Sequence, residues 1–288
     1  MPYPVPALDA PVRVAFLGPA ATSAAHALHD PVPGVLPRFI DVRAGADVRR
    51  VRSALADAAP HVAVVLAPDA VPPGAFAGLR AATLAVVAPG GPPPEGYDRV
   101  LRTPGADRAG AWRSRPLPVD DRLFAPVRRG RGPARAVCVG RSTEHREWVL
   151  TPSKHAHDVV HYAHGLVGAA FAEVMAGADV GIALNAEPGG GFPSQALLHL
   201  AAGQLLISER LTPPAGLQPG IDFLPIDSRE GLMALLHQLK LRPDAYERVR
   251  VRGRIAAEDH RASRVWPRIV RDLLHDLRVF GTTRTLQA

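Results

Sequence analysis

Cysteine and lysine are nearly absent from this chain of 288 residues. Cys138 is the only cysteine, which excludes a disulfide framework and a cysteine-ligated metal cluster. Lys154 and Lys240 are the only lysines, so the formal net charge of +7 comes from arginine. A positive charge of this size favours anionic partners in general.

Aromatic residues and long apolar runs are also scarce. Aromatic residues make up 5% of the chain and its arginines are spread along it, which disfavours nucleic-acid binding by base stacking. A phosphorylated small molecule suits the charge at least as well. No apolar run approaches the roughly 20 residues of a membrane span, and the start MPYPVPALDA lacks a signal-peptide pattern. We therefore predict a cytoplasmic protein.

Several catalytic motifs are missing. The chain has no Gly-x-Ser-x-Gly elbow and no Gly-Lys-Ser/Thr phosphate loop. Its first strand-to-helix turn, GPAATS at 18–23, lacks the Gly-x-Gly-x-x-Gly spacing. These absences count against a nucleotide hydrolase of the P-loop kind, a serine hydrolase and a dinucleotide-dependent dehydrogenase.

The first half of the chain alternates short apolar strands with helices. We expect a mostly parallel sheet covered on both faces. The strands are expected at 12–17, 38–42, 61–66, 84–88 and 98–101, and the helices at 20–28, 47–58 and 76–81. Prolines and the run RRGRG make 104–134 the expected linker.

The second half repeats this alternation and ends in an amphipathic helix. Strands are expected at 136–139, 179–184, 205–207 and 223–226, and helices at 158–175, 194–202, 229–241 and 243–259. The last helix has an apolar stripe from Val265 to Leu277, and Pro267 should start or kink it. We predict an N-terminal domain over 1–116, a C-terminal domain over 117–264 and a terminal helix over 265–288 that returns to the first domain.

A glycine-rich loop connects the strand at 179–184 to the helix that starts at Ser194. Gly189, Gly190 and Gly191 allow the backbone to turn sharply and to approach a ligand closely. A strand, such a loop and a helix start can bind phosphate through free backbone N–H groups. The same arrangement also occurs as a purely structural turn, so the loop alone leaves both interpretations open.

Histidines cluster in SKHAHDVVHYAH at 153–164. On a helix, His157, His161 and His164 would share one face and could ligate a metal. The alternative is a set of histidines that line a polar cleft or the surface. His145 follows a Gly-Arg turn, where it could meet a diphosphate or an acceptor hydroxyl, or lie on the surface. His26 could face a cleft, but we expect it on the surface of the first helix.

Four segments in order resemble the GT-B glycosyltransferases, in particular the spore-maturation (CgeB-like) type. They are VDDRLFAP at 119–126, AVCVGR at 136–141, the run from Asp179 to Ile207, and GLQPGIDFLPID at 216–227. The resemblance implies an α/β fold of two Rossmann-like domains with parallel sheets and a cleft between them. It also implies transfer of a sugar from a nucleotide sugar, the co-substrate, to an acceptor, with no cofactor and no metal.

The resemblance also implies roles for particular residues. Arg141 matches the arginine that contacts the donor phosphates, and Lys154 is the candidate for the partner lysine. Fixed cations and amides of this kind stabilise a leaving diphosphate. The other predicted donor-binding residues are His145, Glu187, Gly190, Gly191, Ser194 and Glu209.

The chain departs from the family at two glutamates. By register from Gly203, their positions are taken by Gly190 and Leu198. Glu187 is the candidate to replace the first, and Glu209 is the candidate to hold the ribose. The alternative function is a non-catalytic protein that binds a nucleotide sugar or another phosphate ligand on the same fold.

Overall fold

The computed structural model describes residues 10–88, 92–105, 111–127, 134–164, 166, 168–189 and 191–281. The chain forms two compact units. Unit 1 comprises Met1–Thr103, Asp107–Asp121 and Arg261–Ala288, and unit 2 comprises Pro104–Ala106 and Arg122–His260. The C-terminal helix therefore belongs to the unit that contains the N-terminal sheet.

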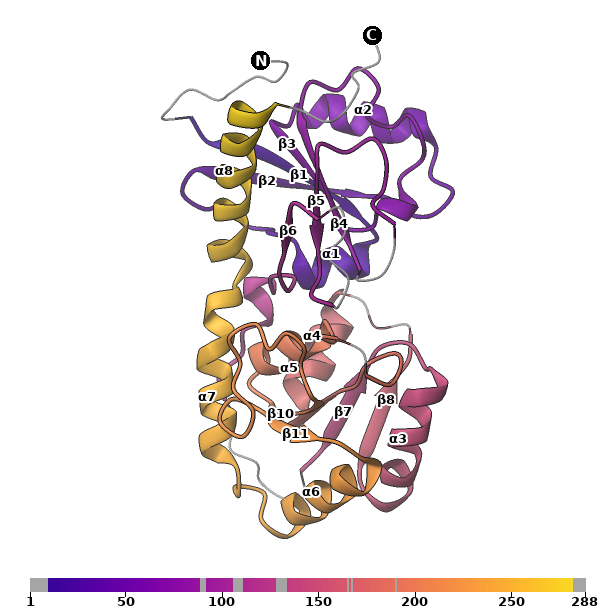
Figure 1. Ribbon diagram of the computed structural model, residues 1–288, viewed down its shortest axis with the longest axis vertical. Coiled ribbons are helices and arrows are strands. Elements are labelled where there is room, and N and C mark those ends of the chain that lie inside the picture. The colour runs from indigo at the N-terminus through magenta and orange to yellow at the C-terminus, as the bar shows by residue number, and fades with distance from the viewer. Residues whose placement is uncertain are drawn as a thin grey trace. The chain divides into compact units, whose positions relative to one another are not determined.

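Unit 1 is built on a parallel sheet with the strand order β2-β1-β3-β4-β5-β6 (Figure 1). Short, mostly apolar segments form these strands because both faces of the sheet are covered. Their bounds are β1 Val12–Gly18, β2 Val35–Asp41, β3 Val62–Val65, β4 Ala82–Val87, β5 Arg99–Arg102 and β6 Arg113–Ser114. The helices are α1 Ala20–His26, α2 Val48–Ala58 and α8 Ala262–Phe280, with a short 3-10 turn at Pro68–Ala70. A second 3-10 turn, at Asp121–Leu123, begins at the last residue of one segment of unit 1 and ends in unit 2.

Helix α8 covers one face of this sheet and α2 covers the other. Val14 and Phe16 of β1 pack with the apolar stripe of α8, whereas Ala15 and Leu17 pack with α2, because side chains alternate along a strand. Trp266 of α8 is fully buried, its ring centroid lies 5.1 Å from that of Phe16, and its Nε1 donates to the carbonyl of His26 at 2.8 Å. The C-terminal helix is thus a core element of unit 1.

Unit 2 is built on a second parallel sheet with the order β11-β10-β9-β7-β8. Helices α3 and α6 pack on one face through Val149, Leu150 and Leu236, among others. Helix α5 packs on the other face, where His199 lies against Gly181. The strands are β7 Ala136–Val139, β8 Val159–Tyr162, β9 Val180–Ala183, β10 Leu205–Glu209 and β11 Leu224–Ile226, and the helices are α3 Glu144–Ala156, α4 Gly168–Gly177, α5 Gln195–Ala201, α6 Arg229–Leu241 and α7 Glu247–Ala257, which a 3-10 turn at Glu258–His260 follows.

The two parallel sheets confirm the predicted class, an α/β fold with two Rossmann-like domains. Some elements differ from the prediction. The helix expected at 158–175 is wrong: β8 and α4 occupy this stretch, and the β-branched pair Val159-Val160 favours the strand. The helix expected at 76–81 is a series of turns, where Gly74 and Gly78 have φ of +78° and +73°.

Two further elements were not expected. The polar stretch after Arg141 forms α3, and β6 lies within the predicted linker and pairs with β5. Helix α8 begins at Ala262 and continues through Pro267. None of the helices in the part of the chain that the structure describes is long and apolar enough to cross a membrane.

We expect Trp266→Ala to lower the free energy of unfolding of unit 1 by about 3–5 kcal/mol, because it empties a packed site and removes a buried hydrogen bond. Chemical denaturation would measure this change. Phe280→Ala is the matched control on the same helix, because Phe280 is 77% exposed, and it should change stability by no more than about 0.5 kcal/mol. Equal effects of the two substitutions would contradict the assignment of α8 to the core.

Candidate functional site

The candidate site lies in unit 2, at the carboxyl ends of β7 and β9. Strand β7 is flanked by β8 on one side and by β9 on the other. The chain leaves β7 toward β8, and β9 continues the sheet in the opposite direction, so the strand order reverses between β7 and β9. Open parallel sheets bind ligands in the crevice at such a reversal, outside the carboxyl ends of the strands. The turn after β7 carries Gly140 and Arg141, and Leu184 and Asn185 follow β9.

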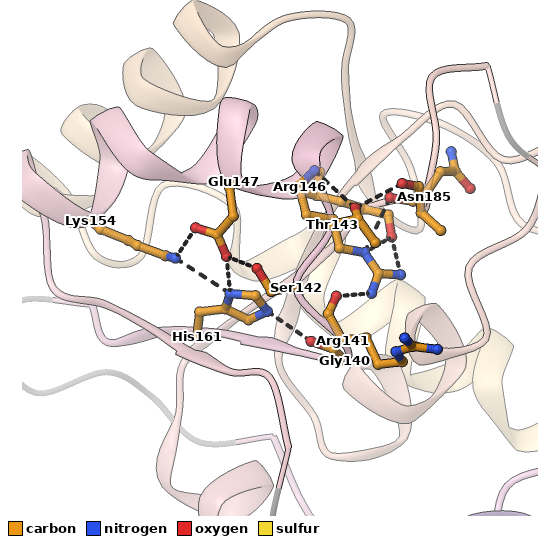
Figure 2. Close-up of polar contacts among 11 residues, drawn as sticks. Gly140, Arg141, Ser142, Thr143, Arg146, Glu147, Lys154, His161 and Asn185 are labelled. Atoms are coloured by element: carbon orange, nitrogen blue, oxygen red, sulfur yellow. Dashed lines mark hydrogen bonds and ion pairs between the residues drawn. The ribbon is translucent and has the colours of Figure 1, made fainter.

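Arg146 joins these two loops. Its side chain projects from the first turn of α3 and is buried. Its Nη1 donates to the carbonyl of Arg141 at 2.7 Å, and its Nη2 donates to that of Leu184 at 2.9 Å. Its Nε lies 3.1 Å from the carbonyls of Leu184 and Asn185. One guanidinium therefore sets the spacing of both loops at the reversal of strand order (Figure 2).

Gly140 makes room for this arrangement. Its φ is +128°, a region that side chains rarely adopt. A Cβ atom at this position would lie 2.9 Å from Nη1 of Arg146 and 2.8 Å from Nε2 of Gln195 at the start of α5. The φ of this turn therefore favours glycine, and a larger residue would also push the Arg146 and Gln195 side chains aside.

Thr143 starts α3 and links it to the loop after β9. Its side-chain oxygen caps the helix by accepting from the backbone N–H of Arg146 at 3.3 Å. The same hydroxyl donates to the carbonyl of Ala186 at 2.8 Å. The helix start and the loop after β9 are thus tied at a second point.

Lys154 lies in a network with Glu147 and His161 on the other side of the turn. Nζ of Lys154 donates to Oε2 of Glu147 at 2.7 Å, and Ser142 donates to Oε1 at 2.6 Å. Nδ1 of His161 lies 3.1 Å from Oε1 of Glu147, and its Nε2 donates to the carbonyl of Gly140 at 2.8 Å. These hydrogen bonds hold Gly140 and Ser142 in position, so the network supports the turn after β7.

Arg141 itself is exposed, and its side chain makes no hydrogen bond or ion pair with any residue in the described ranges. Figure 2 shows its guanidinium directed away from Glu147, Lys154 and His161. The structure therefore does not bring Arg141 and Lys154 together: Lys154 is paired with a carboxylate, whereas the guanidinium of Arg141 is available to an external anion.

His145 and Glu209 are brought together at the same edge of the sheet. Oε1 of Glu209, at the end of β10, accepts from Nε2 of His145 at 2.7 Å, and its Oε2 accepts from the backbone N–H of Asn185 at 2.7 Å. Both side chains are largely buried. Both carboxylate oxygens therefore have a protein donor.

The residues of the glycine-rich loop differ in their exposure and in what they pack against. Glu187 is exposed, and Ser194 is exposed at the start of α5 with no capping bond from its side chain. Gly191 packs against backbone, since a Cβ there would lie 3.0 Å from the carbonyl oxygen of Thr212 and 3.1 Å from that of Pro104. Gly190 lies outside the described residues.

The predicted histidine face does not form. His161 lies on β8 and His157 follows the end of α3, so they share no helix with His164. Within the described residues, no group of three or more His, Cys, Asp or Glu side chains could hold a metal ion. His26 is buried rather than on the surface, with Nδ1 2.8 Å from the carbonyl of Pro118, and this burial lowers its pKa.

Sequence reasoning missed Arg146, Glu147 and Asn185. A signal for the first two was present, because a threonine followed by two glutamates within a turn is typical of a helix start. Reading 144–156 as a helix would have placed Arg146 and Glu147 at its first turn, beside the Gly-Arg turn. Asn185 carries no such signal, since it takes part through its backbone.

No protein-family model and no curated protein matches this sequence. Solved structures match its fold. HepE from Anabaena, in complex with UDP and glucose, has a TM-score of 0.56 at 9% identity, with 92% of this chain and 100% of that chain covered. Sucrose-phosphate synthase from Thermosynechococcus elongatus has a TM-score of 0.58 at 12% identity, with coverage of 92% and 99%. An alpha1,3-fucosyltransferase has a TM-score of 0.53 at 8% identity, with coverage of 98% and 95%.

At these identities the likeness concerns the fold. Together with the two parallel sheets, it shows that this chain has the GT-B fold of two Rossmann-like domains. The CgeB-like subtype stays a prediction, because none of these three structures bears on it.

The Glu147 network has a measurable pH dependence. Hydrogen bonds from Lys154 and Ser142 lower the pKa of Glu147 from 4.5 to about 2. A folded-state pKa below the unfolded one stabilises the protein above about pH 4.5, and this stabilisation is lost as the pH falls toward 2. Because the Glu147 side chain is 37% exposed, solvent screening limits the contribution to about 1 kcal/mol or less.

We therefore expect Glu147→Gln to destabilise unit 2 at pH 6 and to have a smaller effect at pH 3, as measured by chemical denaturation. Glu144→Gln removes the same charge from the first turn of α3, where Glu144 is exposed, and it is the matched control. A destabilisation by Glu147→Gln that did not change between these pH values would contradict the role of the ionised carboxylate.

Proposed function

We propose that this protein transfers a sugar from a nucleotide sugar to an acceptor, with Arg141 binding the diphosphate of the donor. One observation carries the proposal: an exposed arginine without a partner in the described residues lies at the reversal of strand order, on a turn that a buried arginine holds in place. A charge-assisted bond from a guanidinium to a phosphate is strong and directional.

The fold supports the same proposal. HepE, which has this fold, has been solved with UDP and glucose bound, and with UDP-glucose. Fold alone does not imply function, so the argument depends on the site: Arg141 together with backbone N–H groups of the loop after β9 can stabilise the negative charge that develops on a leaving diphosphate.

The remaining candidates take different roles in this proposal. Ser194, Gly190 and Gly191 supply a hydroxyl or amides from the loop before α5, and Glu187, which is exposed, contacts the sugar or the ribose. Lys154 acts through Glu147 and His161 on the position of the turn, because its ammonium is paired with Glu147. We propose that no metal takes part, as the resemblance implies.

The second candidate function is a protein that binds the nucleotide sugar without turning it over. A specific observation favours it: no carboxylate stands at position 198, where Leu198 is buried in α5, and both oxygens of Glu209 already accept hydrogen bonds. A ligand hydroxyl that reached Glu209 would share these oxygens with His145 and the Asn185 amide. This candidate shares the phosphate site with the first and lacks the chemical step.

We expect Arg141→Ala to weaken nucleoside diphosphate binding by about ten- to a hundredfold, because it removes charge-assisted hydrogen bonds to phosphate. Isothermal titration with UDP and with other nucleoside diphosphates would measure the affinity. Arg135→Ala is the matched control, since Arg135 stands at the opposite end of β7 and is 61% exposed. Unchanged affinity in Arg141→Ala, with the fold intact by circular dichroism, would remove the phosphate assignment.

A panel of nucleotide sugars separates the two functions. Each sugar is incubated with the protein, and both thermal stabilisation and release of nucleoside diphosphate are measured. For a transferase we expect both signals with at least one donor, slow release by hydrolysis in the absence of an acceptor, and no effect of EDTA. Stabilisation without release, even when candidate acceptors are added, identifies the binding protein. Stabilisation by none of the donors would contradict both functions.

A further inference from the structure

Strand β2 forms an open edge of the unit 1 sheet. It pairs with β1 on one side only. The backbone N–H of Val42 and the carbonyl of Gly34 bond to β1, and backbone groups alternate in direction along a strand. Phe39 and Asp41 therefore direct their N–H and C=O groups outward, where they have no backbone partner among the described residues.

A groove of about 600 Å³ runs along this edge. Its other wall is one face of α2, formed by Asp47, Arg50, Val51 and Ala54, which recur at helical spacing. Ile40 and Val51 give the groove an apolar floor. Unpaired strand edges beside such a surface bind extended peptides, because main-chain hydrogen bonds provide affinity and the lining side chains provide selectivity.

The charged side chains that line the groove indicate which kind of peptide it favours. Arg38, Arg43 and Arg50 line it together with Asp41 and Asp47. Both aspartates already accept hydrogen bonds within unit 1: Asp41 from the Ala20 amide and Arg43, and Asp47 from the Arg49 amide. Arg50 is exposed and its side chain has no partner in the described ranges. The three arginines exceed the two aspartates by one charge, and Arg50 is the cation in the lining that no described residue pairs with.

We propose that an acidic peptide in extended conformation binds this groove by adding a strand to β2. Its backbone would pair with Phe39 and Asp41, and its carboxylates would face Arg50 and Arg38. A second copy of this chain is a poorer occupant, because pairing two β2 strands would bring the arginines of both copies together, and like charges across strands are destabilising. Pro37 has no N–H to donate, so pairing starts beyond it, toward the carboxyl end of β2. This proposal concerns unit 1 and does not depend on the proposed function.

The probe is a synthetic peptide as long as β2 in which glutamate alternates with threonine. We expect it to bind the full chain at low salt, with protection of the Phe39 and Asp41 amides from hydrogen exchange. The control peptide has the same sequence with alternate residues N-methylated, which keeps the charge and removes the pairing donors; we expect at least about tenfold weaker binding. Equal binding of the two peptides would overturn strand addition.

Two charge-reversal variants test whether the peptide binds in this groove. We expect Arg50→Glu to weaken peptide binding by about tenfold or more, through loss of one attraction and gain of one repulsion. Arg52→Glu makes the same change in net charge on the exposed part of α2 outside the groove, and it should leave binding within about twofold. Equal loss in both variants would show attraction by net charge alone and overturn the proposal.

Two further results would also overturn it. One is the absence of peptide binding at low salt while both units remain folded. The other is concentration-dependent dimerisation in analytical ultracentrifugation that protects the Phe39 and Asp41 amides without any peptide, since this would make a second copy the occupant of the edge.

Discussion

The candidate site depends on the hydrogen bonds of one buried guanidinium. Arg146 donates to the carbonyls of Arg141, Leu184 and Asn185, and none of the ion pairs among the described residues includes it. A buried cation that only carbonyl dipoles solvate keeps a positive potential at the carboxyl edge of the sheet. The same interaction therefore fixes the spacing of the two loops at this edge and favours an anion beside them.

At this edge of the sheet, the side chains that hold the turn after β7 differ from the side chain that can contact a ligand. Arg146, Glu147, Lys154 and His161 satisfy one another or the backbone, and they hold the turn after β7. Arg141 alone presents a free cation from that turn. Rigid support of the turn lowers the backbone conformational entropy that is lost on binding, whereas the side chain of Arg141 is ordered only by the ligand.

The sequence predicted the fold class, most strands and α6 because apolar runs and helical periodicity are local signals. It placed β8 within a helix over 158–175, although the β-branched pair Val159-Val160 favours a strand. The resemblance paired Arg141 with Lys154, the only lysine near the position of the partner lysine, yet Glu147, seven residues before Lys154, binds that ammonium in the fold. Contacts between loops, such as those of Arg146 and Asn185, depend on strand order, which local patterns do not encode.

The hydrogen bonds of Glu209 bear on which ligand groups this edge of the sheet can bind. Glu209 accepts hydrogen bonds from His145 and from the Asn185 amide, and it lies at the edge of the sheet where Arg146 contributes positive potential. The pair of Glu209 and His145 therefore orients an imidazole whose second nitrogen, Nδ1, makes no hydrogen bond within the described residues. Because Nε2–H of His145 is donated to Glu209, Nδ1 of the neutral ring is an acceptor, and it can accept a hydrogen bond from a ligand hydroxyl. The proposed contact of Arg141 with phosphate does not require the two glutamates of the resembled family, whereas the proposed sugar transfer needs polar groups from other residues.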